Sequence, residues 1–188
     1  MLAGDIMAKE FERSTRIKMR EINALSKKYI QDNTEEVIIN NQRAVMAVSM
    51  IYLLVIIAYN IIVPLFFSDW GVTYVYQISL GVHVLFLAFI IIRYRKNYRS
   101  YREVQAISII LQLYVMAFVI VVSIMPVDMA QPAVYFAPVF IGFTIIFIYS
   151  FSTAVILCVI ETVAIILTSF FFKPVEVFNI NMFSSVLT

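Results

Sequence analysis

Apolar residues in this chain occur in long uncharged runs that are separated by short polar segments. Residues 44–68, 71–92 and 104–127 each form one such run, and a membrane-spanning helix needs only ~20 apolar residues. Two more runs follow closely behind them. The pattern predicts an all-α fold, a polytopic transmembrane helix bundle with five complete spans and the start of a sixth. The expected spans cover residues 44–65, 72–92, 104–125, 134–149 and 153–172, with a sixth from about residue 177.

The connections between the expected spans are short, and most carry helix-breaking residues. Pro64 and Gly71 flank the first connection, and Pro126 and Pro132 flank the third. The last apolar stretch, from residue 177, stops after about twelve residues, too few to cross ~30 Å of hydrocarbon. We therefore expect this chain to be the front part of a longer protein. The alternative is a complete five-span protein with an interfacial or re-entrant tail.

The region before the first span is charged and is expected to form a helix outside the membrane, over residues 5–31. Within it Phe11, Ile22, Leu25 and Tyr29 form a weak apolar stripe, which is compatible with a solvated or membrane-skimming helix and with a dimerising one.

A helix start is indicated directly after this charged region. Asn33 or Thr34, followed by Glu36, resembles an N-cap signature, so a second helix should begin there and run into the first span. The chain is thus expected to divide into a cytoplasmic N-terminal helix, residues 1–33, and a transmembrane helical domain, residues 34–188.

Basic residues are distributed almost wholly on one side of the expected spans. Of 14 Lys and Arg, eight lie in residues 1–43 and five in one short loop, and the last is Lys173. Since cytoplasmic loops of membrane proteins are enriched in Lys and Arg, the N-terminus and this loop should be cytoplasmic, in a multi-pass protein of the cell membrane. The loop residues are expected to set the topology, although contact with anionic lipid is an alternative. They are Arg93, Arg95, Lys96, Arg99 and Arg102.

Composition excludes several classes of protein. The chain is 62% hydrophobic and only 14% charged, against about 25% charged in soluble domains. Its one Cys and one His leave no disulfide framework, no CxxC motif and no metalloprotease motif. We find no catalytic motif and expect no cofactor in this chain. Nucleic acid is not expected as a partner either, because the basic residues form no continuous stripe.

Three polar residues lie deep in the expected spans and are the candidate site. His83, Gln112 and Glu161 fall near the middle of the second, third and fifth spans, so one cluster at the membrane midplane is geometrically allowed. An ionisable group at that depth is costly and normally faces the bundle interior with a partner. The cluster could respond to protons or contact a small ligand. It could also translocate an ion, or merely join helices by hydrogen bonds that average about 0.6 kcal/mol.

The overall pattern resembles the multi-pass N-terminal regions of bacterial membrane-anchored GGDEF proteins, the diguanylate cyclases, particularly those of Firmicutes. The resemblance covers residues 35–188. It rests on the charged leader, the long first span and two segments, RYRKNYRSYRE and FAPVFIGFTIIFIYSFSTAVILCVIETVAIILTSFFFKP.

The resemblance implies a sensor and anchor function for these residues. The Gly-Gly-Asp-Glu-Phe signature of the family is absent, so no catalytic residue carries over. A cyclase domain would follow the sixth span, and GTP, magnesium and cyclic di-GMP would belong to that domain. A sensor histidine kinase has a similar membrane region.

Three functions therefore remain open. The first is a membrane sensor and anchor for a cytoplasmic signalling domain, which would act as a homodimer in the lipid bilayer and respond to a small-molecule signal. The second is a six-span, transporter-type substrate-binding subunit, which the presence of only 4 Gly disfavours. The third is a structural membrane protein without a ligand.

Overall fold

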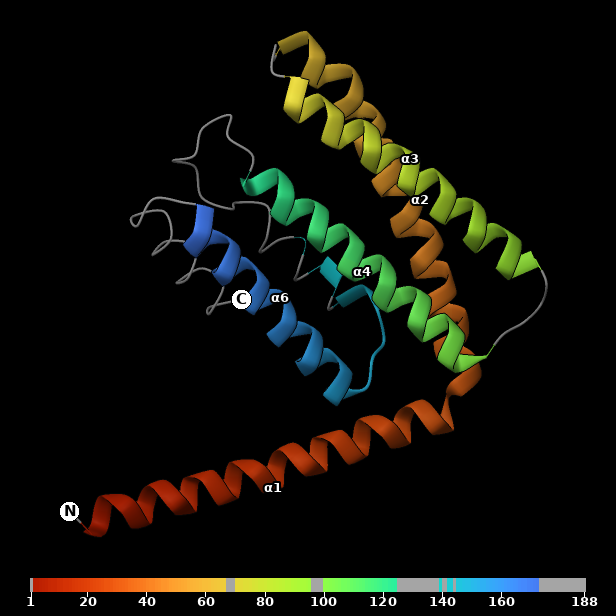
Figure 1. The fold of residues 1–188 in the computed structure, drawn as a ribbon. Helices are drawn as coiled ribbons and strands as arrows, with labels where there is room; N and C mark the ends of the chain where they lie inside the picture. Colours follow the sequence, from red (N-terminus) through yellow and green to blue (C-terminus); the bar gives the residue numbers. More distant parts are fainter. Residues whose placement is uncertain are drawn as a thin grey trace.

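The described part of the chain folds into long helices, and four of these are long and apolar enough to cross a membrane. The computed structural model describes residues 2–66, 70–95, 100–124, 139, 142, 143 and 145–172. Four helices form a bundle, and the N-terminal helix lies across one end of it (Figure 1). The helices are α1 (Leu2–Asp32), α2 (Thr34–Phe66), α3 (Trp70–Arg95), α4 (Tyr101–Ile124) and α6 (Phe151–Phe172).

The break between α1 and α2 falls where the sequence indicates it, but the polar side chains there act differently from the expectation. The Asn33 side-chain amide donates to the Tyr29 carbonyl at 2.9 Å, and the Thr34 hydroxyl donates to the Ile30 carbonyl at 2.8 Å. Both side chains therefore bond to carbonyls in the last turn of α1, where the Tyr29 carbonyl also accepts the Asn33 N–H at 3.0 Å. They do not cap the free N–H groups at the start of α2.

Helices that follow each other in the chain, α2 with α3 and α3 with α4, run antiparallel, so α2 and α4, which also pack on each other, run parallel. Tyr52 on α2 contacts Ser79 on α3, and Asn60, further along α2, contacts Tyr76, which is earlier in α3. The contacts of α3 with α4 also run in opposite directions, as shown by the pairs Ser79–Tyr114 and Arg93–Glu103.

Helix α6 also runs parallel to α4. Gln105 of α4 pairs with Thr153, and Gln112, two turns later, pairs with Glu161. Figure 1 shows the two helices side by side and pointing the same way. The chain must therefore return to the end of the bundle near α1 between the end of α4 and the start of α6.

Four candidate spans match expected ones in position. They are Thr34–Ile62, Tyr74–Tyr94, Tyr101–Val122 and Phe151–Phe172. The expected span 134–149 is only partly described: residues 139, 142, 143, 145 and 146 are helical, and residues 147–150 are not. That helical stretch therefore ends at Ile146, three residues before the expected end. The expected start of a sixth span, from residue 177, lies outside the described residues.

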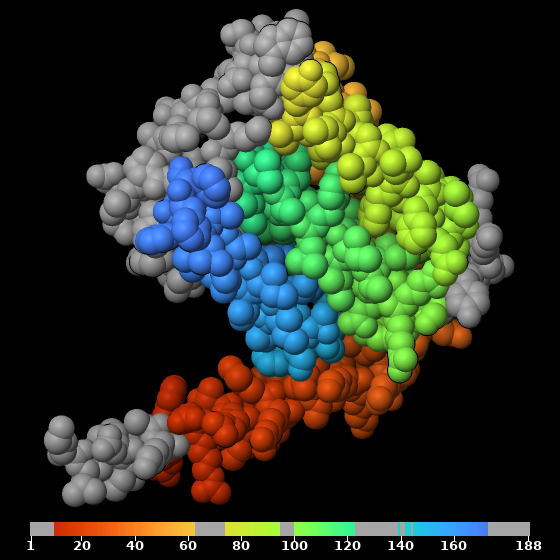
Figure 2. All heavy atoms as spheres, in the orientation of Figure 1, coloured from red at the N-terminus to blue at the C-terminus, as the bar shows by residue number. Residues whose placement is uncertain are grey.

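The bundle buries several polar side chains and exposes many large apolar ones, as suits a protein surrounded by lipid. The buried face of α6 consists of Leu157, Glu161, Ile165 and Ser169, spaced four residues apart so that they lie on one stripe. Its outward face is exposed and apolar, for example at Ile156. A helix that is apolar all round is typical of a membrane span. The space-filling view shows α6 packed on α4, with α1 below them and touching the lower end of α6 (Figure 2).

Candidate functional site

Gln112 and Glu161 meet in the interior between α4 and α6. The Gln112 Nε2 group donates a hydrogen bond of 2.8 Å to Glu161 Oε1. Both side chains are almost fully buried, with 1% and 2% of their surface exposed. Glu161 was predicted to need a partner, and among the described residues its one hydrogen-bond partner is the neutral Gln112.

This contact uses only one of the two polar side-chain atoms of each residue. Glu161 Oε2 and Gln112 Oε1 are both buried and have no hydrogen-bond partner among the described residues. The hydroxyl of Tyr149 is also buried without a partner, and it lies near enough to Glu161 for the carboxylate charge to act on it. Unpaired buried polar atoms are rare in proteins, so each one calls for a physical explanation.

His83 lies in a second polar centre, between α2 and α3. Its Nε2 atom is 2.9 Å from the backbone carbonyl of Ser49. Since a carbonyl only accepts hydrogen bonds, Nε2 must carry the proton. Nδ1 is buried and has no partner in the described part of the chain, which fits a bare nitrogen in a neutral ring.

Aromatic rings and hydroxyls complete this second centre. The rings of Tyr52 and Tyr114 lie 4.8 Å and 5.8 Å from the His83 ring, the first edge-on and the second stacked. The Ser79 hydroxyl is 3.2 Å from the Tyr52 hydroxyl and 2.8 Å from that of Tyr114. The Tyr114 hydroxyl also donates to the Ser79 carbonyl at 2.9 Å. These hydrogen bonds join α2, α3 and α4 without any charged group.

The three candidate residues therefore fall into two groups. The structure brings Gln112 and Glu161 together, and within the described residues no hydrogen bond joins either of them to His83. Sequence reasoning did not find the hydroxyl partners Tyr52, Ser79 and Tyr114. Single hydroxyls in apolar helices are common, and only the packing shows which of them meet.

A third set of polar contacts, also missed, links α1 to the start of α6. The first three N–H groups of a helix have no partner within that helix. Here the Phe151 N–H donates to the Ser26 hydroxyl at 3.1 Å, and the Ser152 N–H donates to Asn23 Oδ1 at 3.3 Å. The Thr153 N–H donates to the Ser150 hydroxyl at 3.3 Å, the usual N-cap contact.

The Asn23 contact has a second component. Asn23 Oδ1 also accepts a hydrogen bond of 2.7 Å from the Ser152 hydroxyl. Two of the three free N–H groups of α6 are therefore satisfied by side chains of α1, which lies 125 or more residues earlier in the chain. We call Asn23, Ser26 and their partners Phe151 and Ser152 the α1–α6 clasp.

Asn41, near the start of α2, holds the segment just before the clasp. Its side chain donates to the Ile148 carbonyl at 3.0 Å and accepts from the Ile148 N–H at 2.9 Å. Asn41 is 1% exposed. The non-helical backbone of Ile148 thus has side-chain partners where no helix supplies them.

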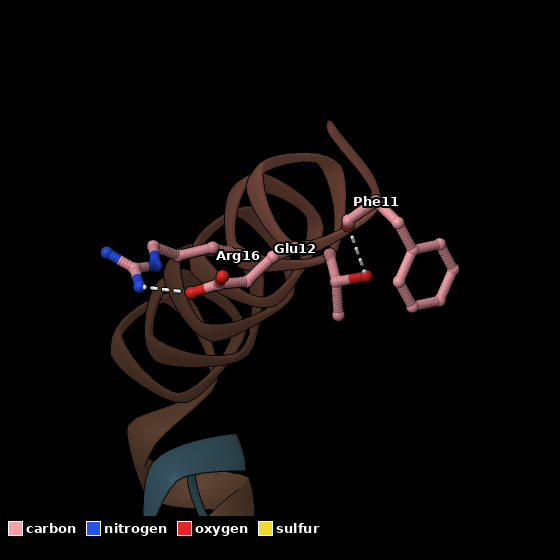
Figure 3. A network of polar contacts seen from close by, with 4 residues as sticks. Phe11, Glu12 and Arg16 are labelled. Atoms are coloured by element: carbon pink, nitrogen blue, oxygen red, sulfur yellow. Dashed lines mark hydrogen bonds and ion pairs between the residues drawn. The ribbon is translucent and has the colours of Figure 1, made fainter. Parts of the chain in front are cut away.

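Beyond the clasp, α1 and α6 diverge and leave an open groove of about 650 Å³. Its α1 wall includes an i,i+4 ion pair in which Arg16 Nη2 donates to Glu12 Oε1 at 2.9 Å (Figure 3). Both side chains are about two-thirds exposed, so the pair adds little to stability. The groove is lined by Phe11, Glu12, Thr15, Arg16, Met19, Arg20, Asn23, Phe151, Ser152, Val155 and Ile156.

The basic residues expected to set the topology lie where α3 ends and α4 begins. Arg93 Nε donates to Glu103 Oε1 at 2.6 Å, which links the two helices. Arg95 is the last residue of α3, and Arg102 lies in the first turn of α4 and is exposed. Lys96 and Arg99 lie outside the described residues.

No group of three His, Cys, Asp or Glu side chains that could hold a metal ion occurs in the part of the chain that the structure describes. No family model, curated protein or solved structure matches the chain significantly. The multi-pass membrane character of the protein rests on its four apolar helices.

Proposed function

We propose that this chain is the membrane-embedded sensor and anchor module of a bacterial signal-transduction protein, the N-terminal part of a diguanylate cyclase. The observation that carries the proposal is the α1–α6 clasp. Through it, a charged helix at one end of the bundle hydrogen-bonds to the first turn of the membrane helix that contains the buried Glu161.

Through the clasp, the hydrogen bonds of α1 depend on the position of α6. Hydrogen bonds to helix N–H groups are directional, so a rotation or axial shift of α6 would break or redirect them. Signalling proteins commonly use helix movements of about 1–2 Å at such contacts. A small signal bound among the spans would therefore reach α1 through α6.

The proposal includes five complete spans and the start of a sixth. The parallel arrangement of α4 and α6 supports it, because two parallel helices that both cross a bilayer require an odd number of crossings between them. Residues 134–149 would supply that crossing, and the sixth span would return the chain to the side of α1.

A cytoplasmic N-terminus is also part of the proposal. The start of α2, the end of α3 and the starts of α4 and α6 all lie at the end of the bundle nearest α1 (Figure 1). Arg93, Arg95 and Arg102 are thus at the same end as the charged α1, as the positive-inside rule requires for one cytoplasmic face.

We further propose that the module is a homodimer. The stripe Phe11, Ile22, Leu25 and Tyr29 on α1 is 75%, 47%, 67% and 49% exposed, and its spacing suits a short coiled-coil contact with a second copy. A disulfide that links two chains of the Leu25→Cys, Cys158→Ala variant in membranes would support this dimer. Its absence under oxidising conditions would argue against it.

Labelling from outside the cell tests the topology. In a Cys158→Ala background, an impermeant thiol reagent should modify Ser68→Cys and leave Ser100→Cys unmodified unless the membrane is opened. The opposite result would reverse the orientation.

The function itself is tested at the output. The gene beyond codon 188 should encode a GGDEF domain, and an immediate stop codon would refute the proposal. In the complete protein, the double variant Asn23→Ala/Ser26→Ala should change the cellular cyclic di-GMP level at equal expression. The control Ser14→Ala, at an exposed position of α1, should not change it. An unchanged cyclic di-GMP level in the double variant would show that the clasp takes no part in signalling.

A further inference from the structure

The hydrogen bond between Gln112 and Glu161 leaves one oxygen on each residue unused. A primary amide and a protonated carboxylic acid can join through two hydrogen bonds in a ring, one from N–H to the acid carbonyl and one from the acid O–H to the amide oxygen. The structure contains the first of these bonds, from Gln112 Nε2 to Glu161 Oε1 at 2.8 Å. The two atoms that the second bond would join, Glu161 Oε2 and Gln112 Oε1, are the two without partners.

We propose that Glu161 and Gln112 form a proton-binding site, in which one proton on Glu161 Oε2 is donated to Gln112 Oε1. The proton comes from bulk water, and binding it converts a buried carboxylate into a neutral acid. A single proton thus provides a partner for both unused atoms and removes the charge. This proposal does not depend on the signalling role proposed above.

Burial favours the neutral form for a clear reason. An isolated carboxylate in an apolar interior loses its hydration, and such groups usually become neutral or acquire a cationic partner. Glu161 is 2% exposed, and among the described residues only Gln112 bonds to it. No Lys, Arg or His in the described part of the chain forms an ion pair with it.

The titratable groups of the surrounding elements are few. They include Tyr149, in the segment before α6, on whose hydroxyl the charge of Glu161 acts, and Cys158, which lies one turn earlier on α6 itself. The charged residues of α4, Arg102 and Glu103, are about ten residues from Gln112, roughly 15 Å along the helix. On α2, which packs against α4, Arg43 lies near the helix start and Tyr52 belongs to the His83 centre. On α3, His83 bonds to Ser49.

Loss of the proton would have a defined structural effect. The carboxylate would keep the hydrogen bond from Gln112 Nε2. Its second oxygen, now negatively charged, would lie opposite Gln112 Oε1, which is also a hydrogen-bond acceptor. Two acceptors repel, so the pair would have to separate or admit water. The contact between α4 and α6 is therefore expected to loosen when the proton leaves.

Infrared spectroscopy of the purified protein in lipid tests the site directly, because the carbonyl band of a protonated carboxyl is separate from carboxylate bands. At neutral pH the protein should show a protonated-carboxyl band that Glu161→Gln removes. The control Glu12→Gln, at an exposed carboxylate, should leave the band unchanged. Gln112→Leu should shift the band, because the acid then loses its amide partner.

A thermal measurement gives a second, independent readout. If the folded protein holds a proton that the unfolded chain releases, raising the pH lowers its stability. The melting temperature should therefore fall as the pH rises above neutral, and it should fall less in Glu161→Gln, whose amide can form both hydrogen bonds at any pH.

Three outcomes would overturn the proposal. One is a neutral-pH spectrum without a protonated band that depends on Glu161. Another is a carboxylate band that Glu161→Gln removes at neutral pH, with or without added sodium. The last is a band that Gln112→Leu leaves unshifted, since the proton would then not bridge the pair.

Discussion

The two buried polar centres of this bundle differ in what their hydrogen bonds leave unused. In the His83 centre, Ser79 accepts or donates to two tyrosine hydroxyls, and the histidine donates to a backbone carbonyl. Every hydroxyl of Tyr52, Ser79 and Tyr114 has a partner, whereas His83 Nδ1 and the Ser49 hydroxyl have none among the described residues. In the Glu161 centre, the two oxygens without a described partner belong to the two residues of one hydrogen-bonded pair, Gln112 and Glu161.

The two centres therefore contribute differently to the bundle. The first is a neutral network that joins α2, α3 and α4, and protonation is not needed to complete it. The second joins α4 to α6 and is complete only when one proton is added. The first centre is therefore suited to holding helices together, and the second to changing state.

The position of each centre strengthens the contrast. Glu161 lies on α6, whose first turn is held by Asn23 and Ser26 of α1. Nothing comparable links His83 directly to α1 among the described residues. A change at Glu161 thus has a physical path to α1, whereas a change at His83 would first have to alter the packing of α2 on α3.

The largest effect is expected from removing the acid altogether. Glu161→Leu leaves both ends of the buried Gln112 amide without partners, so the free energy of unfolding should fall by about 2 kcal/mol. Glu161→Gln should keep most of the stability, because two amides can form the same two-bond ring. Unfolding in mixed micelles, followed by circular dichroism, gives both values. Equal losses in the two variants would show that the hydrogen bonds to Gln112 contribute nothing to stability.

The membrane helices and the need of Glu161 for a buried partner could be predicted from the sequence, because both follow from local rules. Uncharged runs of about 20 residues indicate spans, and a lone Glu161 within such a run requires an interior position. Four candidate spans and the buried carboxylate agree with those rules. The start of α2 at Thr34 was also predicted, although the side chains there serve α1 instead.

The partners could not be predicted, because they depend on which helices pack together. Residues at equal depth need not meet: His83 and Glu161 lie on α3 and α6, and their contacts are to α2 and α4 respectively. The clasp joins residues more than a hundred positions apart through ordinary Asn and Ser side chains. The positions of Asn and Ser residues along a sequence do not indicate which distant segment they contact.

A moderate effect is expected in the neutral network. Tyr52→Phe removes one hydroxyl from Ser79 and should lower the free energy of unfolding by about 1 kcal/mol. Tyr114→Phe should cost a similar amount. The double variant should cost less than the sum, because both hydroxyls share the Ser79 side chain. Tyr29→Phe, at a half-exposed tyrosine on α1, is the control. Strict additivity would mean that the hydroxyls act independently.

The smallest effect is expected from His83 itself. His83→Phe keeps an aromatic ring between Tyr52 and Tyr114 and removes only the bond to the Ser49 carbonyl. That carbonyl belongs to a helix and retains its helical partner, so the loss should be near the average of about 0.6 kcal/mol for hydrogen bonds between membrane helices.

The same variant also gives the sharpest separation of the two centres. A neutral His83 takes no part in proton binding above neutral pH, so His83→Phe should leave the fall of melting temperature with rising pH unchanged. Glu161→Gln should reduce that fall. If His83→Phe abolished the pH dependence, the two centres would be one coupled site and the contrast between them would be wrong. If it only lowered the melting temperature by the same small amount at every pH, the histidine would be a structural link between α2 and α3, and Glu161 would be the titrating group of the bundle.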